Sequence, residues 1–259
     1  MMKQHMVPVV VVLGLLVLHS RSTTAQGDTG ALTAAQAAIA CAPPPALELP
    51  RKDGLRVVGG QTSEIRREFS VRDVVVLSAG AGSGLKIGQR FFARRPVTWG
   101  DRSTTHPRVV RTAGWLRVTA VNEAMALASV EFTCVEISVG DYLDPFAVPV
   151  VPEGSDRTDT SGEPDFTALG KVVFGTDEKS TGGEGDFMIV DRGTQQQIVP
   201  GRRLAIYRDL KTTGLPLAPV GEAIVISAAP STALIRITFS KDVVRTDDFI
   251  VPRKPAPPR

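Results

Sequence analysis

Histidine and cysteine are scarce in this chain, and aromatic residues make up only 5% of it. Of the three histidines, only His106 lies beyond the first 25 residues, and the only cysteines are Cys41 and Cys134. Zinc sites are built mainly from His and Cys ligands, so these counts argue against a zinc enzyme. The G-x-S-x-G nucleophile elbow is also missing, so no motif predicts a catalytic serine. We therefore expect no catalytic residue, no metal site and no cofactor.

Long apolar runs are absent except near the N-terminus, where one extends from Val7 to Leu18. A membrane span needs roughly 20 apolar residues, and this run has about a dozen. With Lys3 before it and the small residue Ala25 after it, the pattern is typical of a secretory signal peptide over residues 1–25. A retained signal anchor is the less favoured alternative. We expect a cleaved chain without a transmembrane segment, in the periplasm or secreted.

The two cysteines both lie beyond this leader. An even cysteine count in an exported chain favours a disulfide, here between Cys41 and Cys134. Alternatively, Ala38-Ile39-Ala40-Cys41 forms a lipobox, in which Cys41 carries a lipid anchor instead.

Glycine and proline are abundant, with 24 and 19 residues, and many of the glycines recur at a fixed spacing. Asp73, Gly80, Gly88 and Arg90 align with residues 113 positions later, and a second block from Gly114 to Asp141 aligns at an offset of 107. Such internal similarity predicts two copies of one fold. The offset falls by six, so the first copy has a connection six residues longer.

Within both copies, apolar residues alternate with polar ones, as in Ala126–Phe132 and Ala233–Phe239. This period of two indicates antiparallel strands with one buried face. We therefore predict an all-β protein of two tandem small antiparallel β-barrel modules, SH3-like or similar, with a short N-terminal extension. The expected parts are a signal peptide (1–25), an extension with a short helix over Leu32–Ala40 (26–54), module one (55–148), a linker (149–168), module two (169–252) and a disordered tail (253–259).

Two motifs invite a functional interpretation that comparison of the copies disfavours. The glycines from Gly80 to Gly84 follow a strand as in a phosphate-binding loop, but the second copy replaces most of them, so a turn is favoured. Asp141 and its equivalent Asp248 could be a catalytic carboxylate pair. Because they occupy equivalent positions in separate copies, turn-forming aspartates that accept backbone N–H bonds explain them more simply.

Basic residues concentrate in module one. Removing Lys3 and Arg21 with the leader leaves 28 basic against 27 acidic residues, a net charge of +1, yet the segment 86–117 has eight basic residues and only Asp101 to oppose them. Such a patch can hold an anionic polymer, an acidic protein partner or a membrane surface. The same excess is explained equally well if these basic side chains lie on the outer face of strands and pair with acidic residues elsewhere in the chain. The predicted ligand-binding residues are Arg90, Arg94, Arg95, Arg108 and Arg111.

The turn and strand from Gly84 to Phe91, the glycine-initiated strands at Gly114 and Gly221, the alternating strands and the closing Gly140–Leu143 resemble known modules. They are similar to the small SH3-like β modules of bacterial exported envelope proteins, found beside LysM domains and in the C-terminal domain of flagellar assembly protein T. The resemblance implies a non-catalytic role in the bacterial cell envelope, and no LysM motif is visible here.

The sequence thus predicts a non-catalytic binding or scaffolding protein of the cell envelope. Its expected partners are an envelope polymer or an envelope protein, with association at a membrane surface as a further option. Nucleic acid is not expected, because export separates the chain from it and few aromatic side chains adjoin the patch. The alternative is a hydrolase of an envelope polymer that uses His106.

Overall fold

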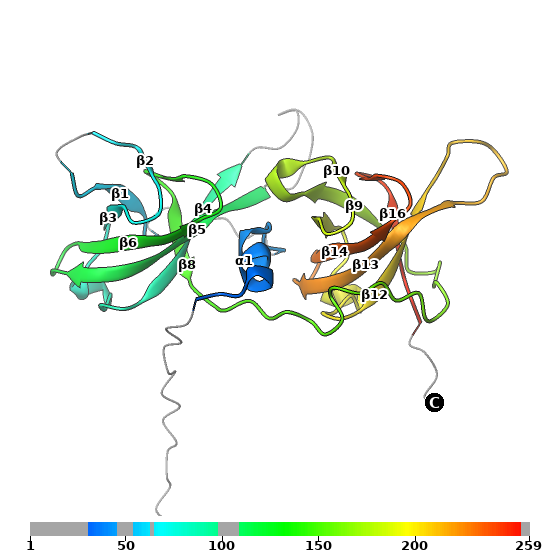
Figure 1. Cartoon of the computed structure of the whole chain (residues 1–259), viewed down its shortest axis with the longest axis horizontal. Helices are drawn as coiled ribbons and strands as arrows, with labels where there is room; N and C mark the ends of the chain where they lie inside the picture. The colour runs from blue at the N-terminus through cyan, green and yellow to red at the C-terminus, as the bar shows by residue number, and fades with distance from the viewer. Residues whose placement is uncertain (1–30, 46–53, 63–64, 98–108, 255–259) are drawn as a thin grey trace, which may run out of the picture. The chain divides into compact units, whose positions relative to one another are not determined.

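A computed structural model of the chain describes residues 31–45, 54–62, 65–97 and 109–254 (Figure 1). The predicted signal peptide and residues 255–259 of the predicted tail lie outside these ranges. From Leu32 onward the described residues belong to one compact unit. Its helix is α1 (Ala34–Cys41), and its strands are β1 (Val57–Gly60), β2 (Glu68–Phe69), β3 (Val74–Leu77), β4 (Arg90–Val97), β5 (Val109–Val121), β6 (Ala126–Thr133), β7 (Ile137–Ser138), β8 (Tyr142–Pro145), β9 (Gly170–Gly175), β10 (Thr181–Gly182), β11 (Phe187–Val190), β12 (Arg203–Arg208), β13 (Ala218–Ala228), β14 (Ala233–Ser240), β15 (Val244–Arg245) and β16 (Phe249–Pro252).

The short helix α1 has start and stop residues in its own sequence. The Thr33 hydroxyl accepts the Gln36 backbone N–H, and the Gln36 side chain accepts the Thr33 N–H, which together form a capping box. The helix ends at Cys41, before Pro43, because proline has no N–H to continue the ladder. The helix predicted for Leu32–Ala40 is confirmed, displaced by one or two residues.

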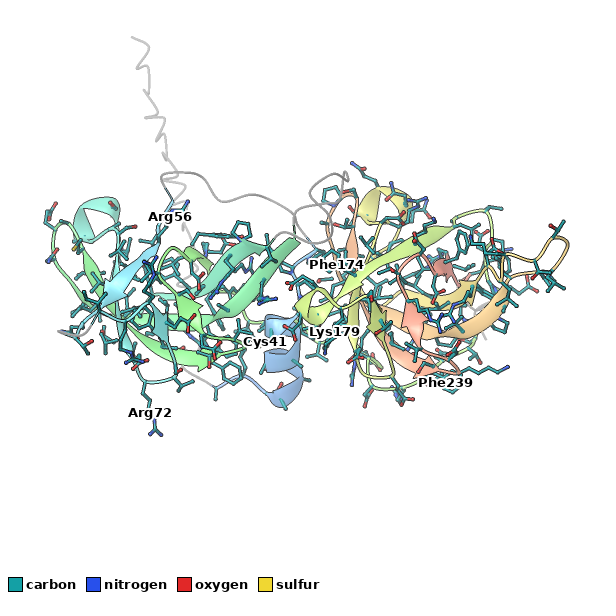
Figure 2. All side chains as sticks on the ribbon, turned by 90° about the horizontal axis from the view of Figure 1, so that it is seen from above. Cys41, Arg56, Arg72, Phe174, Lys179 and Phe239 are labelled. Atoms are coloured by element: carbon teal, nitrogen blue, oxygen red, sulfur yellow. A yellow bond between two sulfur atoms is a disulfide. The ribbon has the colours of Figure 1, made fainter. Side chains whose placement is uncertain are left out.

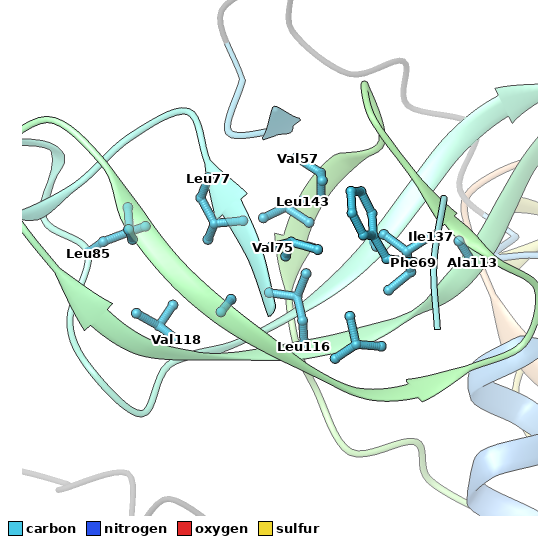
Figure 3. Close-up of a cluster of buried hydrophobic side chains, with 14 residues drawn as sticks. Val57, Phe69, Val75, Leu77, Leu85, Ala113, Leu116, Val118, Ile137 and Leu143 are labelled. Atoms are coloured by element: carbon cyan, nitrogen blue, oxygen red, sulfur yellow. The ribbon is translucent and has the colours of Figure 1, made fainter. Parts of the chain in front are cut away.

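The N-terminal half forms one antiparallel six-stranded sheet in the order β1-β3-β6-β5-β4-β8, here called the first sheet. It curls until β8 approaches the start of β1, where an isolated bridge between Arg56 and Tyr142 and three backbone hydrogen bonds join residues 55–57 to 140–143. Strands β1 and β8 themselves form no continuous ladder. Its concave side holds a core of aliphatic side chains with Phe69 at one end (Figure 3). The alternating Ala126, Ala128 and Val130 of β6 all face this core and are at most 2% exposed.

The C-terminal half closes completely, in the order β11-β14-β13-β12-β16-β9, and is here called the barrel. Closure comes from β16 pairing with β9, with Phe249 opposite Lys171 and Ile250 opposite Gly170. Its interior is filled by apolar side chains such as Met188, Leu204 and Ile235, none of them accessible to solvent. The predicted all-β class is confirmed, with one closed barrel and one curled sheet.

Gly80, the first glycine of the segment that resembles a phosphate-binding loop, lies where two turns pack closely together. Residues Ala81–Ser83 form one 3₁₀ turn and no helix follows them. A Cβ on Gly80 would lie 2.1 Å from the Asn122 carbonyl oxygen, and one on Gly193 would lie 2.1 Å from that of Ala229. Only glycine fits against the neighbouring hairpin at these places, so their role is structural.

Tyr142 on β8 gives the first sheet a titratable group at high pH. Burial and the nearby Asp144 carboxylate raise the pKa of Tyr142 to about 12, from an ordinary value of 10.0. The unfolded chain therefore loses this proton first, and the contribution of Tyr142 to stability, intact below about pH 10, is lost as pH rises through 12. Urea unfolding across this pH range should show that the free energy of unfolding declines less in Tyr142→Phe than in the wild type. An equal decline in both proteins would contradict this assignment.

Candidate functional site

Four of the five predicted patch residues, Arg90, Arg94, Arg95 and Arg111, lie on β4 and β5 of the first sheet and pair with acids from other segments. Arg90 Nε donates to Glu131 Oε2 at 2.7 Å, and Arg94 Nη1 donates to Asp144 Oδ2 at 2.8 Å. Arg111 forms an ion pair with Glu178. Arg108 lies outside the described residues.

Arg95 pairs with the most deeply buried of these acids. Its Nη2 donates to Oδ2 of Asp141 at 2.9 Å, and the Asp141 side chain is 3% exposed. The same carboxylate accepts the Ser138 backbone N–H at 2.8 Å. Asp141 is therefore a turn-forming aspartate, as predicted, and it also anchors one of the proposed ligand-binding arginines.

The barrel has the same arrangement at the aligned positions. Asp248 accepts the Arg245 backbone N–H at 2.7 Å and bonds Arg208 Nε and Nη2, both at 2.8 Å. These hydrogen bonds to Asp248 raise the pKa of Arg208. The arginines 95 and 208 are separated by the offset of 113 seen elsewhere, and this repetition was the sequence feature that could have identified both pairs.

One part of the patch keeps a positive excess. Arg90 on β4 lies opposite Arg117 on β5, and both guanidinium groups bond the single carboxylate of Glu131. Their side chains are 11% and 29% exposed. Two cations thus share one anion at the surface, which favours an additional anionic group there.

Aromatic side chains border this pair of arginines. The ring of Phe132 stacks on that of Trp115 with a centroid distance of 4.4 Å, and Phe132 is 37% exposed. The guanidinium of Arg90 lies 3.9 Å from the centre of the Phe146 ring. This aromatic border was not predicted from the sequence, because Phe132 and Phe146 lie outside the basic segment 86–117. We call Arg90, Arg94, Arg117, Glu131 and Phe132 the basic face.

The N-terminal extension covers the other side of the aromatic group. Ala40 of α1 packs with Phe92 and Trp115, which are 5% and 4% exposed. The predicted disulfide between Cys41 and Cys134 is present and fixes the helix there. A lipid on Cys41 would require this sulfur to be free, so the disulfide argues against the lipobox.

The corresponding surface of the barrel is built differently. Trp115 and Phe146 align with Glu222 and Arg253, and these two form an ion pair in which Arg253 Nε donates to Glu222 Oε2 at 2.9 Å. Arg253 Nη1 also donates to the Gly162 carbonyl at 2.7 Å, and Arg203 Nη2 to the Gly154 carbonyl at 2.9 Å. Arginines of the barrel therefore hold the predicted linker, and the first position of the predicted tail is an ordered part of the barrel.

The described residues contain no group of three or more His, Cys, Asp or Glu side chains that could hold a metal ion. Among the same residues, no helix has the length and apolar character to span a membrane. His106, the residue on which the hydrolase alternative depends, lies outside the described residues. No protein-family model matches the chain, and no curated protein is detectably similar to it in sequence.

Proposed function

We propose that this protein is a non-catalytic binding or scaffolding protein of the bacterial cell envelope, exported to the periplasm or secreted. The disulfide between Cys41 and Cys134 supports export, because such bonds persist in oxidising compartments. The ion pairs of the two candidate catalytic aspartates support a binding role over a catalytic one. Asp141 and Asp248, the candidate catalytic carboxylates, are nearly fully buried and bonded to arginine.

We propose further that the first sheet and the barrel are two copies of one SH3-like module. Three features support this: the aligned offsets in the sequence, the matching strand orders, and the Arg–Asp pairs at aligned positions. A fold hosts many functions, so the binding site has to be argued from its own residues.

The ligand we propose is an anionic envelope polymer, bound at the basic face. The observation that carries this proposal is the sharing of Glu131 by Arg90 and Arg117 beside the exposed Phe132 ring. Arginine supplies bidentate bonds to carboxylate or phosphate groups, and the ring offers an apolar surface to a sugar. Arg95 contributes by holding the turn at Asp141, and Arg94 adds a partly exposed cation at the edge.

Sedimentation with isolated cell envelopes tests the basic face. We expect Arg90→Gln/Arg94→Gln/Arg117→Gln to lower the bound fraction about tenfold at low salt, since each lost charge-assisted contact weakens binding. Thermal unfolding of the variant checks that the fold is kept, because Arg90 is only 11% exposed and its guanidinium also contacts the Phe146 ring. Wild-type binding should weaken with added salt as exposed charges are screened.

The matched control is Lys171→Gln/Arg192→Gln/Lys211→Gln, which removes the same charge from partly exposed positions of the barrel. It should bind like the wild type. Equal retention of the basic-face variant and the wild type would contradict the proposed site, and equal losses in both variants would indicate attraction by net charge alone.

A further inference from the structure

A cavity of about 310 Å³ lies between α1, the linker and the barrel. Its walls include Ala34, Ala35 and Ala38 of α1 on one side and Phe187 and Ile226 of the barrel on the other. The cavity exists because the helix presents alanines here, whose methyl groups are too short to fill the space opposite the barrel side chains. The volume is at the lower end of the range for small-molecule sites.

The lining of this cavity is mainly apolar but includes the cation Arg236 and the hydroxyl-bearing Ser155. Arg236 of β14 lies between Phe187 of β11 and Ile224 of β13 in the sheet register. Its Nη1 donates to the Ser155 carbonyl at 3.1 Å. In the described part of the chain, no carboxylate forms an ion pair with Arg236, unlike the arginines of the basic face.

An arginine without a carboxylate at an apolar cavity has a specific chemical preference. The guanidinium keeps donors for an anionic head group, because the one hydrogen bond that it donates to the described residues is made through Nη1. The alanine and phenylalanine walls favour an unbranched apolar body. Ala34, Ala35 and Ala38 are exposed on the helix surface, so a ligand can reach the cavity from solvent.

We propose that this cavity binds a single-chain anionic amphiphile, with its head group on Arg236 and its alkyl chain between α1 and the barrel. A free fatty acid and one chain of an anionic lipid share this chemistry. The site uses none of the residues of the basic face, so its test is independent of the polymer-binding proposal.

Titration calorimetry of the full disulfide-bonded chain with sodium decanoate, kept below its micelle-forming concentration, tests the site. Decanoate should bind at a ratio of one to one, and decanol and decyltrimethylammonium should bind at least about tenfold more weakly, because they lack the charge that pairs with arginine. Octanoate and hexanoate should lose about fourfold in affinity for each methylene removed from the buried chain. Vesicles of anionic lipid, compared with decanoate, distinguish a membrane source from a free fatty acid.

Two variants separate the head-group and chain contacts. Arg236→Gln should weaken decanoate binding about tenfold, while Arg72→Gln, which removes the same charge from an exposed position (Figure 2), should have no effect. Ala38→Leu fills the cavity and should abolish binding, and Ala124→Leu on an exposed turn of the first sheet is its control. Thermal unfolding of each variant checks that the fold is kept.

The proposal is overturned if decanoate does not bind, if decanol binds equally well, or if Ala38→Leu binds like the wild type. Equal weakening by Arg236→Gln and Arg72→Gln would overturn the head-group assignment. Binding to vesicles that is unchanged in Ala38→Leu would exclude the cavity as the lipid site.

Discussion

Replacing Cys41 and Cys134 together by serine lowers the free energy of unfolding by roughly 4 to 5 kcal/mol. The bond joins residues 93 positions apart, and in the chain-entropy model a loop of this length restricts the unfolded chain by about that amount. Without the disulfide, α1 should also detach from the aromatic side chains on which it packs. Ala40 then no longer covers Phe92 and Trp115, which are almost fully buried in the disulfide-bonded protein.

Chemical denaturation followed by tryptophan fluorescence measures both effects. The wild type in reducing agent should match the double serine variant, and reducing agent should leave the variant unchanged. If the wild type and the double serine variant unfold at the same denaturant concentration without reducing agent, the bond does not restrict the unfolded chain as proposed. Unchanged fluorescence of the folded variant would mean that the capped helix packs on Trp115 without covalent attachment.

Replacing Asp248 by asparagine destabilises the protein by about 3 kcal/mol, because removal of one partner from a buried ion pair leaves the other uncompensated. Asp248 is 3% exposed and bonds Arg208 through both carboxylate oxygens. The variant also disturbs the turn that begins at Arg245, whose N–H the carboxylate accepts.

A second carboxylate that pairs with Arg208 provides the matched control. Asp242 also pairs with Arg208, at 2.7 Å, but its side chain is 56% exposed. Asp242→Asn should cost much less than Asp248→Asn, since solvent screens the exposed pair. Urea unfolding of the two variants provides the comparison, and losses of equal size would show that burial does not decide the strength of the pairs with Arg208.

The strands and turns were predictable because their causes are local. Alternation correctly identified Ala126, Ala128 and Val130 as the buried face of β6, and Pro43 marked the end of α1. Phe132, which continues this alternation in the sequence, is instead 37% exposed, because the register with β5 shifts between Trp115 and Leu116. The closure of the barrel was predicted for both halves but is complete only in the second. It depends on the ladder between β16 and β9, segments about 80 residues apart in the sequence, whereas β8 and β1 are joined at their ends by one isolated bridge and a few backbone hydrogen bonds.

The chain's residues alone determined the β class, the disulfide partners and the structural nature of Gly80 and Asp141, because alternation, cysteine count and repetition are read along the chain. Tertiary structure alone decided the charge of the arginine patch. Along the sequence, Asp101 is the only acid within residues 86–117. In the folded chain, antiparallel pairing of the strands brings Glu131 to Arg90, Asp144 to Arg94 and Asp141 to Arg95. Electrostatic energy depends on distance in space, and for this reason Arg94, Arg95 and Arg111 are paired with acids. Among the described residues of this segment, the positive excess lies at the exposed Lys86 and at Arg90 and Arg117, which share one carboxylate.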